Sequence, residues 1–321
     1  HRDLHSFPTR RSSDLAKKDF VPVLTHVNIK AGTIQAYNGM VMLSSPIDLN
    51  LDCSPEASTF IKAIQTCKES IQMHMTPGGK LSVKSGKFKT LIPCSSDEFP
   101  NAVPAGQRIE LPGEGFIPAL RRLEPFIAED ASRPWARGIL FTGQTANATN
   151  NIILAQLWLP FSFPIAVNLP HAAVNELIRI KEEPIEMMVE ENQLTFMYEG
   201  GRWLRTQLYS TKWPDIEALY AKVHPGAHDI PEGFFDALRE VRPFVDSIER
   251  VYLKHGVVAT SAEPELATTS EVDDLNADSI YNVEMLLMLD GVADKFNFAA
   301  WPAPAIFYGD NIRGCVVGIK L

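Results

Sequence analysis

An eleven-residue segment occurs twice in this chain, and the distance between its copies constrains the fold more than any other feature. Residues 116–126 (FIPALRRLEPF) recur as residues 234–244 (FFDALREVRPF), with Phe, Ala-Leu-Arg and Pro-Phe at the same positions. The offset of 118 residues is far longer than the roughly 20–50 residues of a solenoid repeat. We therefore interpret the chain as domain-sized copies, which disfavours most architectures built around one catalytic site.

Length, charge and cysteine content indicate folded soluble domains. The length of 321 residues suits about two domains, and the repeat raises the expectation to three. With a net charge of -9, the surface as a whole should not attract nucleic acid, so DNA binding requires basic side chains gathered on one face. The four cysteines form no C-x-x-C pair, which predicts free thiols in a reducing compartment. No apolar run approaches the ~20 residues of a membrane span, so we expect a cytoplasmic protein.

The first fifteen residues are interpreted separately. Residues 7–15 (FPTRRSSDL) match the translation of a widely used sequencing-library adapter. We hypothesise that residues 1–15 are a read-assembly artefact on a truncated gene, and we exclude them from the fold. The alternative is a disordered basic tail, and a nucleotide record with codons other than those of the adapter would support it.

Shorter repeats extend the duplication. Residues 80–86 (KLSVKSG) and 193–200 (QLTFMYEG) both alternate like a strand and end at glycine. Helices are expected at residues 56–68, 171–180 and 284–289, each after a Ser or Asn that could cap it, with Pro55 and Pro170 in the first turn. Proline and glycine predict linkers at residues 100–112 and 224–231.

These repeats predict an α+β fold of three copies, each with helices and strands in alternation. The expected domains are residues 16–108, 109–224 and 225–321. The first copy lacks the opening helix of the other two, at the place where the adapter-like residues stand.

The repeated helix has one apolar and one basic face. At about 100° per residue, Phe116, Leu120 and Leu123 share a face with Ala119, and Arg121 and Arg122 lie opposite. Such faces are ordinarily just solvated, but basic residues recur at matched positions of the copies. The candidate DNA-binding residues are Lys62, Lys68, Arg121, Arg122, Arg179, Lys181, Arg239 and Arg242.

No catalytic or metal-binding pattern emerges from the sequence. The chain has no P-loop, no G-x-G-x-x-G, no H-E-x-x-H and no G-x-S-x-G motif. His224 and His228 have the spacing of a helical metal pair, but Pro225 and Gly226 between them argue against a helix. We expect no catalytic residue, no metal and no cofactor, as in a binding protein.

The order and spacing of several segments resemble the bacterial-type DNA sliding clamp, the beta subunit of DNA polymerase III, in a divergent and phage-like version. The resemblance covers residues 16–321. It rests on residues 22–24, 79–90 and 98–100 in the first copy, on 137–141, 148–155 and 213–215 in the second, and on 281–283 with a final strand at 316–321 in the third.

The resemblance implies a ring of six domains made by a homodimer, with sheets outside and helices lining the hole. Such a ring encircles duplex DNA without reading its sequence and tethers the replicative polymerase. The arginine face of the repeated helix would then point inward. The resemblance also implies that DNA polymerase and clamp loader dock through short peptide motifs, and that the protein is not itself an enzyme.

In this family the peptides dock in an apolar cleft between the second and third domains. Carried over by position, the cleft consists of Thr149, Asn151, Ile152, Leu154, Pro214, Leu219, Val317, Ile319 and Leu321. Residues 149–154 are TNNIIL and residues 317–321 are VGIKL, where the family has Thr-Asp-Gly-His-Arg-Leu and Met-Pro-Met-Arg-Leu. The lost His-Arg pair implies a different preferred peptide. Ile152 and Leu154 are equally well explained as core strand residues.

Two other function classes remain open. A clamp-fold scaffold that binds proteins without encircling DNA is favoured by the divergent cleft and the modest number of inward cations. A persistent monomer would support that scaffold. An enzyme using surface carboxylates has no support beyond the presence of Asp and Glu.

Overall fold

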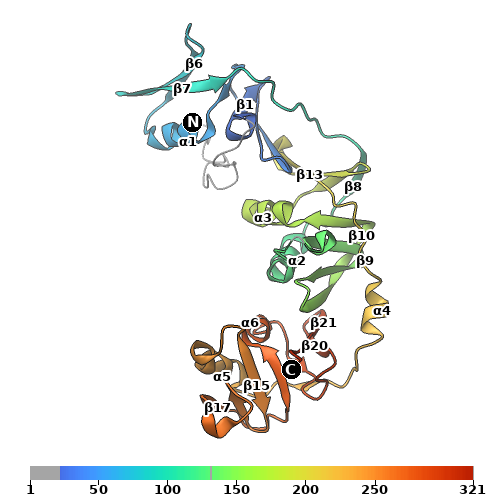
Figure 1. The fold of residues 1–321 in the computed structure, drawn as a ribbon. Coiled ribbons are helices and arrows are strands. Elements are labelled where there is room, and N and C mark those ends of the chain that lie inside the picture. Colours follow the sequence, from blue (N-terminus) through green and yellow to red (C-terminus); the bar gives the residue numbers. More distant parts are fainter. Residues whose placement is uncertain (1–21, 131, 321) are drawn as a thin grey trace. The chain divides into compact units, whose positions relative to one another are not determined.

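The computed structural model describes residues 22–130 and 132–320, so residues 1–15 and Leu321 lie outside the described part. Helices and antiparallel strands alternate along the chain, which confirms the expected α+β class (Figure 1). Two compact units result. Unit 1 is the chain up to Ile117 together with Asn175–Leu208, and unit 2 is Pro118–Val174 together with Tyr209–Leu321. The division into three domains at residues 108 and 224 stays a prediction.

Unit 1 contains a seven-stranded and a four-stranded sheet. The larger has the order β1-β2-β3-β13-β12-β11-β8 and the smaller β4-β7-β6-β5. The strands of the larger are β1 Val27–Lys30, β2 Thr33–Tyr37, β3 Val41–Pro46, β8 Gln107–Glu110, β11 Glu186–Val189, β12 Gln193–Met197 and β13 Trp203–Gln207. Those of the smaller are β4 Ser54–Pro55, β5 Ile71–Met75, β6 Lys80–Ser85 and β7 Phe88–Ser95. Both predicted glycine-ended strands, β6 and β12, are confirmed.

Helix α1, Ala57–Thr66, covers the smaller sheet through Phe60 and Ala63, which belong to one core with Leu81, Val83 and Ile92. Its start differs from the prediction. The capping residue is Glu56, whose Oε2 accepts from the amide of Thr59 at 3.2 Å. Because Pro55 pairs with Cys94 across β4 and β7, it is extended and cannot lie in the first turn.

Unit 2 also contains two sheets, a six-stranded one in the order β14-β19-β20-β21-β10-β9 and a four-stranded one in the order β17-β16-β15-β18. The first is formed by β9 Gly138–Thr149, β10 Ile153–Pro170, β14 His228–Asp229, β19 Lys295–Phe296, β20 Ala305–Gly309 and β21 Ile312–Val316. The second is formed by β15 Arg250–Lys254, β16 Val257–Ala259, β17 Thr269–Glu271 and β18 Ser279–Asn282. The pairing of β10 with β21 joins segments far apart in the sequence.

The helices of unit 2 are α4 Ile216–Tyr220, α5 Phe234–Val241 and α6 Val283–Leu287, and the boundary between the units passes through α2 Phe116–Leu123 and α3 His171–Ile180. Asn282 caps α6 as predicted, with its Oδ1 accepting from the amide of Met285 at 3.1 Å. Pro170, however, ends β10 and lies just before α3. Short 3-10 turns are η2 Pro22–Thr25, η3 Glu124–Phe126, η4 Pro134–Ala136, η5 Glu199–Gly201, η6 Arg242–Phe244 and η7 Pro264–Leu266.

Both copies of the repeated segment are helices with the predicted apolar face. In α2 the buried residues include Phe116, Leu120 and Leu123. In α5 they are Phe234, Ala237, Leu238 and Val241.

Some predicted bounds differ from the structure. Helix α1 ends at Thr66 rather than at residue 68, and α6 spans Val283–Leu287 rather than 284–289. The linkers at 100–112 and 224–231 contain the edge strands β8 and β14, because extended backbone beside an unpaired edge forms hydrogen bonds with it. The final strand ends at Val316 rather than at residue 321.

Candidate nucleic-acid face and peptide cleft

The polar face of α2 carries two arginines in different environments. Arg121 is exposed, and no ion pair within 4 Å involves it among the described residues. Arg122 is half-buried, and its Nη2 donates to the carbonyl oxygen of Asp310 at 2.7 Å. Since that acceptor is neutral, both guanidinium groups keep their net charge available for an anion.

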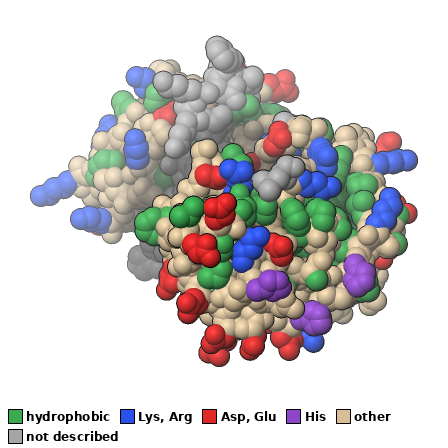
Figure 2. Space-filling view, turned by 60° about the horizontal axis from the view of Figure 1, so that its bottom comes forward, with side chains coloured by type: hydrophobic (Ala, Val, Ile, Leu, Met, Phe, Trp, Pro, Cys, Tyr) green, Lys and Arg blue, Asp and Glu red, His purple; other side chains and the backbone are tan. Residues whose placement is uncertain are grey.

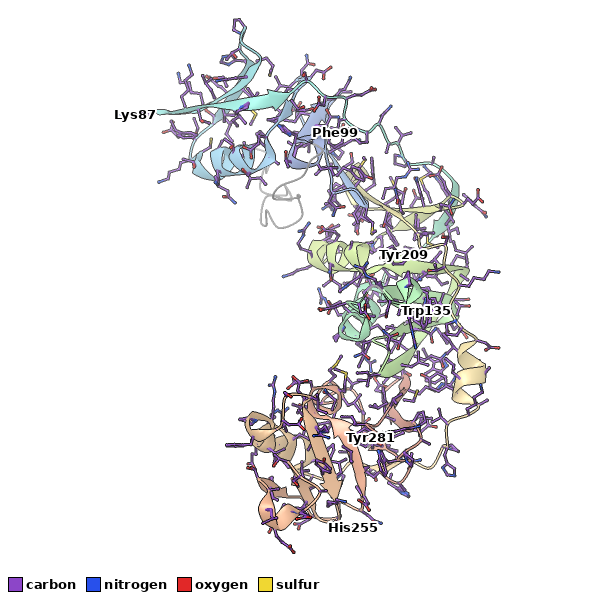
Figure 3. The ribbon with its side chains drawn as sticks, in the orientation of Figure 1. Lys87, Phe99, Trp135, Tyr209, His255 and Tyr281 are labelled. Atoms are coloured by element: carbon purple, nitrogen blue, oxygen red, sulfur yellow. The ribbon has the colours of Figure 1, made fainter. Side chains whose placement is uncertain are left out.

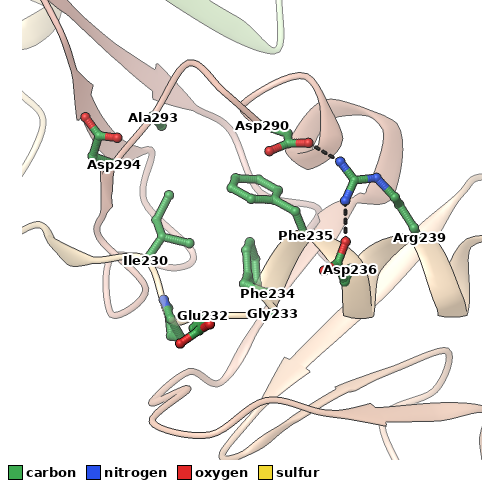
Figure 4. A pocket seen from close by; sticks show the side chains of 11 residues that line it. Ile230, Glu232, Gly233, Phe234, Phe235, Asp236, Arg239, Asp290, Ala293 and Asp294 are labelled. Atoms are coloured by element: carbon green, nitrogen blue, oxygen red, sulfur yellow. Dashed lines mark hydrogen bonds and ion pairs between the residues drawn. The ribbon is translucent and has the colours of Figure 1, made fainter.

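The matching face of α5 is different, because its arginines are paired with carboxylates. Arg239 donates through Nη1 to Oδ1 of Asp236 at 2.6 Å, and through Nη2 to Asp290 (Figure 4). Arg242, in η6, forms a bidentate ion pair with Glu284, in which Nη2 donates to Oε2 at 2.8 Å. Helices α5 and α6 are in contact, so α6 and the turn after it supply the partners.

Arg239 and its two aspartates also line a shallow pocket of about 360 Å³ at the start of α5. Glu232 and Asp294 bring the acidic residues of its lining to four, and the rest of the lining includes the apolar Ile230, Phe234 and Phe235 (Figure 4). Figure 2 brings the C-terminal part of the chain forward, and basic and acidic side chains lie intermixed on its nearest face. This part of the surface therefore has no uninterrupted basic patch.

The remaining cations lie in unit 1. Lys62 is exposed on α1, whereas Lys68 and Lys181 lie just past the ends of α1 and α3 rather than on the helices. Arg179 forms an ion pair with Glu176, which is buried. Burial raises the pKa of Glu176 to about 7, while the hydrogen bond from Arg179 opposes that shift. Of the eight predicted DNA-binding residues, three are thus bound to carboxylates: Arg179, Arg239 and Arg242.

Several residues predicted to form the peptide cleft lie in unit 2, around the turn between β9 and β10. Thr149 pairs with Leu154 across the two strands, and its hydroxyl donates to the carbonyl of Ile153 at 2.7 Å. Asn150 accepts from the amides of Ile152 and Ile153, at 3.1 and 2.7 Å. Asn151 adopts a left-handed conformation with φ of 74°, which asparagine tolerates better than most residues. The turn therefore holds Ile152 exposed at its tip.

Helix α4, which carries the predicted Leu219, packs close to this turn. Its N-cap Asp215, directly after Pro214, accepts from the amide of Ala218 at 3.0 Å. Ile216 and Tyr220 pack on Leu154, while Leu219 is 38 % exposed on the same helix. These contacts fix α4 beside the β9–β10 turn and leave the side chain of Leu219 exposed to solvent.

Val317 and Ile319, two C-terminal residues predicted for the cleft, lie in different surroundings. The amide of Val317 donates to the carbonyl of Ile152 at 2.9 Å, so these two exposed apolar side chains are neighbours. Ile319 instead packs with Tyr252 and Ile280 on the four-stranded sheet, and Trp301 Nε1 donates to its carbonyl at 2.9 Å. Leu321 lies outside the described residues.

The structure also brings other residues close to the predicted cleft residues, which the sequence did not indicate. Cys315 packs with Leu154 and α4, and Trp213 joins them from the segment before α4. The ring of Trp213 contacts that of Trp135 in a tilted arrangement, with 4.9 Å between centroids and 60° between planes (Trp135 is labelled in Figure 3). Cys315 reaches this place because β21 pairs with β10, where Leu154 and Cys315 are partners although far apart in sequence.

Arg313 holds α4 to the sheet. It donates to Gln156 Oε1 at 2.7 Å and to both oxygens of Glu217, and its guanidinium lies 4.1 Å from the ring centroid of Tyr220. The hydrogen bond from Arg313 lowers the pKa of Glu217, and burial raises that of Tyr220. This network fixes one side of the cleft.

Other kinds of site were sought in the described part of the chain. Residues 22–130 and 132–320 contain no group of three or more His, Cys, Asp or Glu side chains placed to hold a metal ion. Within the same ranges, none of the helices has the length and apolar character needed to cross a membrane. Cys53, Cys67, Cys94 and Cys315 are free thiols.

No protein-family model and no curated protein matches this sequence. Solved structures do match it. The DNA polymerase sliding clamp from Bacillus subtilis superposes with a TM-score of 0.80, at 14 % identity over 96 % of this chain and 94 % of that one. The chain has the fold of the bacterial sliding clamps.

Two further clamps agree. The beta clamp of Helicobacter pylori bound to a DNA ligase peptide gives a TM-score of 0.77 at 18 % identity, over 95 % of this chain and 94 % of that one. The DNA polymerase III beta subunit of Bartonella birtlesii bound to griselimycin gives 0.79 at 16 % identity, over 96 % and 94 %. The likeness at these identities establishes the clamp fold, which was inferred from the order of short segments alone.

Proposed function

We propose that this protein is a DNA sliding clamp, a non-catalytic accessory protein that encircles duplex DNA in the cytoplasm and tethers a replicative polymerase. The observation that supports this most is the clamp fold over 96 % of the chain, with solved clamps covered almost from end to end. Helices α2 and α5, each apolar on one face and polar with arginine on the other, suit a lining that faces DNA.

The physical basis of such a clamp is topological. Arginine and lysine contact phosphates without reading bases, so binding is independent of sequence and weakens with salt. A closed ring cannot leave DNA sideways, so each contact can be weak and can exchange as the ring slides. Weak contacts reconcile DNA binding with a net charge of -9.

The test is retention on a nicked circular plasmid, loaded by a clamp loader, compared with the same plasmid cut once. A sliding clamp stays on the circle during gel filtration and runs off the linear form. Equal retention on both forms would contradict the proposal.

Ring closure requires a homodimer, and two oppositely charged surfaces suit its interface. The β6–β7 hairpin of unit 1 carries exposed Lys84, Lys87 and Lys89 beside Leu91 (Lys87 is labelled in Figure 3). In unit 2, residues 263–274 carry five carboxylates and no cation, next to Leu266, which is 80 % exposed. Strand β17 lies in this acidic segment, at the edge of the four-stranded sheet beside β16, so its outer backbone groups can accept another chain.

We propose that the lysine hairpin of one subunit meets the acidic segment of the other. Lys87→Glu should convert the dimer to a monomer in analytical ultracentrifugation, and adding Glu265→Lys should restore the dimer by reversing both signs. A monomer at all concentrations for the unsubstituted protein would refute the interface.

Polymerase and clamp loader would dock short peptides in the cleft around Ile152, Leu219 and Val317. The solved clamp of Helicobacter pylori, which holds a DNA ligase peptide, motivates this extension. The cleft is apolar, so burying one Leu or Phe of a peptide contributes about 2 kcal/mol. Peptide arrays probed with the protein, and with Leu219→Asp as the blocked control, would identify the motif. Binding unchanged by Leu219→Asp would contradict this location.

A clamp-fold scaffold that does not encircle DNA is the second candidate. The ion pairs of Arg179, Arg239 and Arg242 favour it, because they remove three of the eight expected cations. A scaffold would bind the peptides and show no preference for circular over linear DNA.

A further inference from the structure

The second copy of the repeated helix differs from the first in how its arginines are partnered. Arg239 occupies the position of Arg121, but Pro118 of α2 is replaced by Asp236 in α5. Asp236 bonds Arg239 at 2.6 Å, and Asp290 binds the same guanidinium from the turn after α6. Arg121 has no such carboxylate among the residues that the structure describes.

Helices α5 and α6 are in contact, and this contact is called the α5–α6 seam below. Helix α6 and the turn after it place one carboxylate at each end of the seam. Glu284 lies in the first turn of α6 and accepts two hydrogen bonds from Arg242. Asp290 lies in the turn that follows α6. A fork onto both oxygens is the strongest geometry that an arginine makes with a carboxylate, and it is the geometry that a phosphate would use. Both arginines are therefore held by groups that imitate phosphate.

The local charge leads to the same conclusion. From Phe234 to Phe244 and from Val283 to Asp290, two arginines face four carboxylates, the fourth being Glu240, which accepts from the hydroxyl of Ser270 at 2.7 Å. Within α1 the one charged residue is Lys62, and residues 116–126 of the first copy have two arginines and one carboxylate, Glu124, which is bonded to His171. The α5–α6 seam is the acidic exception among these helices.

We propose that Asp236, Glu284 and Asp290 act as internal phosphate mimics that keep Arg239 and Arg242 from DNA. These carboxylates limit the affinity of the α5–α6 seam, and contact with DNA falls to the unpaired cations such as Lys62 and Arg121. The inference rests on the proposed function, since it concerns the DNA-facing surface of the clamp.

The test compares two variants with equal charge change. One carries Asp236→Asn, Glu284→Gln and Asp290→Asn. The control carries Asp48→Asn, Asp97→Asn and Glu98→Gln, three exposed carboxylates with no ion pair in the described structure. Binding to a short linear duplex is measured by fluorescence anisotropy across salt concentrations, so ring closure is not required for the readout.

Two freed arginines add two phosphate contacts, so the seam variant should lose about ten-fold more affinity than the control between 50 and 200 mM salt. Adding Arg239→Ala and Arg242→Ala should remove this gain, and the same two changes in the original chain should alter binding less than about two-fold. Equal salt dependence of the seam variant and the control would overturn the inference.

The proposed function is judged separately, by retention of the original chain on circular against linear DNA. A chain that fails that test while the seam variant gains salt-dependent binding to the short duplex refutes the clamp and supports the phosphate mimics. A chain that passes while the seam variant matches the control keeps the clamp and loses the phosphate mimics.

Discussion

The polarity of the repeated helix can be tested with two phenylalanines from one segment. Phe234 begins α5 and is 2 % exposed, whereas Phe244 ends η6 and is 62 % exposed. The ring of Phe234 meets that of Phe298 edge-on, with 5.3 Å between centroids. Phe234→Ala and Phe244→Ala delete the same atoms from these two environments.

The expected losses differ several-fold. Removing a buried phenylalanine costs about 3–5 kcal/mol, because the transfer term and the cavity add. The edge-on pair with Phe298 places Phe234 in the upper part of this range, since such pairs contribute about 0.5–1.5 kcal/mol beyond area burial. Phe244 buries roughly a third of its side chain, so its loss should be about 1 kcal/mol or less.

Urea unfolding followed by circular dichroism measures both. At an m-value of about 2 kcal/mol/M, Phe234→Ala should move the unfolding midpoint by about 2 M and Phe244→Ala by about 0.5 M or less. Similar shifts for the two variants would refute the assignment of the apolar face.

Three further predictions address burial, capping and the cleft. Burial raises the pKa of Glu176 to about 7, so ionisation of this carboxyl group destabilises the fold. The free energy of unfolding of the original chain should therefore fall by up to about 3 kcal/mol relative to Glu176→Gln as pH rises from 4.5 to 8. A relative gain in stability with rising pH would mean that the ion pair with Arg179 dominates. Asp215→Ala should cost about 1 kcal/mol by removing the N-cap of α4, and Asp215→Asn should restore most of it in thermal unfolding; equal melting of both variants would exclude the cap. Val317→Asp should weaken peptide binding at least about ten-fold by placing a charge in an apolar site, while the exposed control Val103→Asp leaves it unchanged; equal effects would argue against the cleft.

Local periodicity was enough to predict most of the helices. The apolar residues of 116–126 recur every three or four positions, and this alone placed α2, α5 and their buried faces. The predicted bounds of α3, residues 171–180, agree with the structure. Strand alternation likewise located β6 and β12.

What the sequence could not predict depends on partners distant along the chain. The ion pair of Arg239 with Asp290 joins residues 51 positions apart, and nothing in the period of either helix indicates it. Pro55 was misplaced because its pairing with Cys94 decides its conformation. Ile319 was assigned to the cleft by position, yet its hydrogen bond to the carbonyl of Ile280 holds it on the four-stranded sheet.

The lifetime of the protein on DNA of different topology tests the central proposal most directly. The protein is loaded on a nicked circle, the circle is cut once, and the amount bound is followed over time, with and without a protein block at both ends. A sliding clamp stays on the circle, leaves after the cut, and is retained again when the ends are blocked. Loss at the same rate from circle, open linear and end-blocked DNA would contradict encirclement.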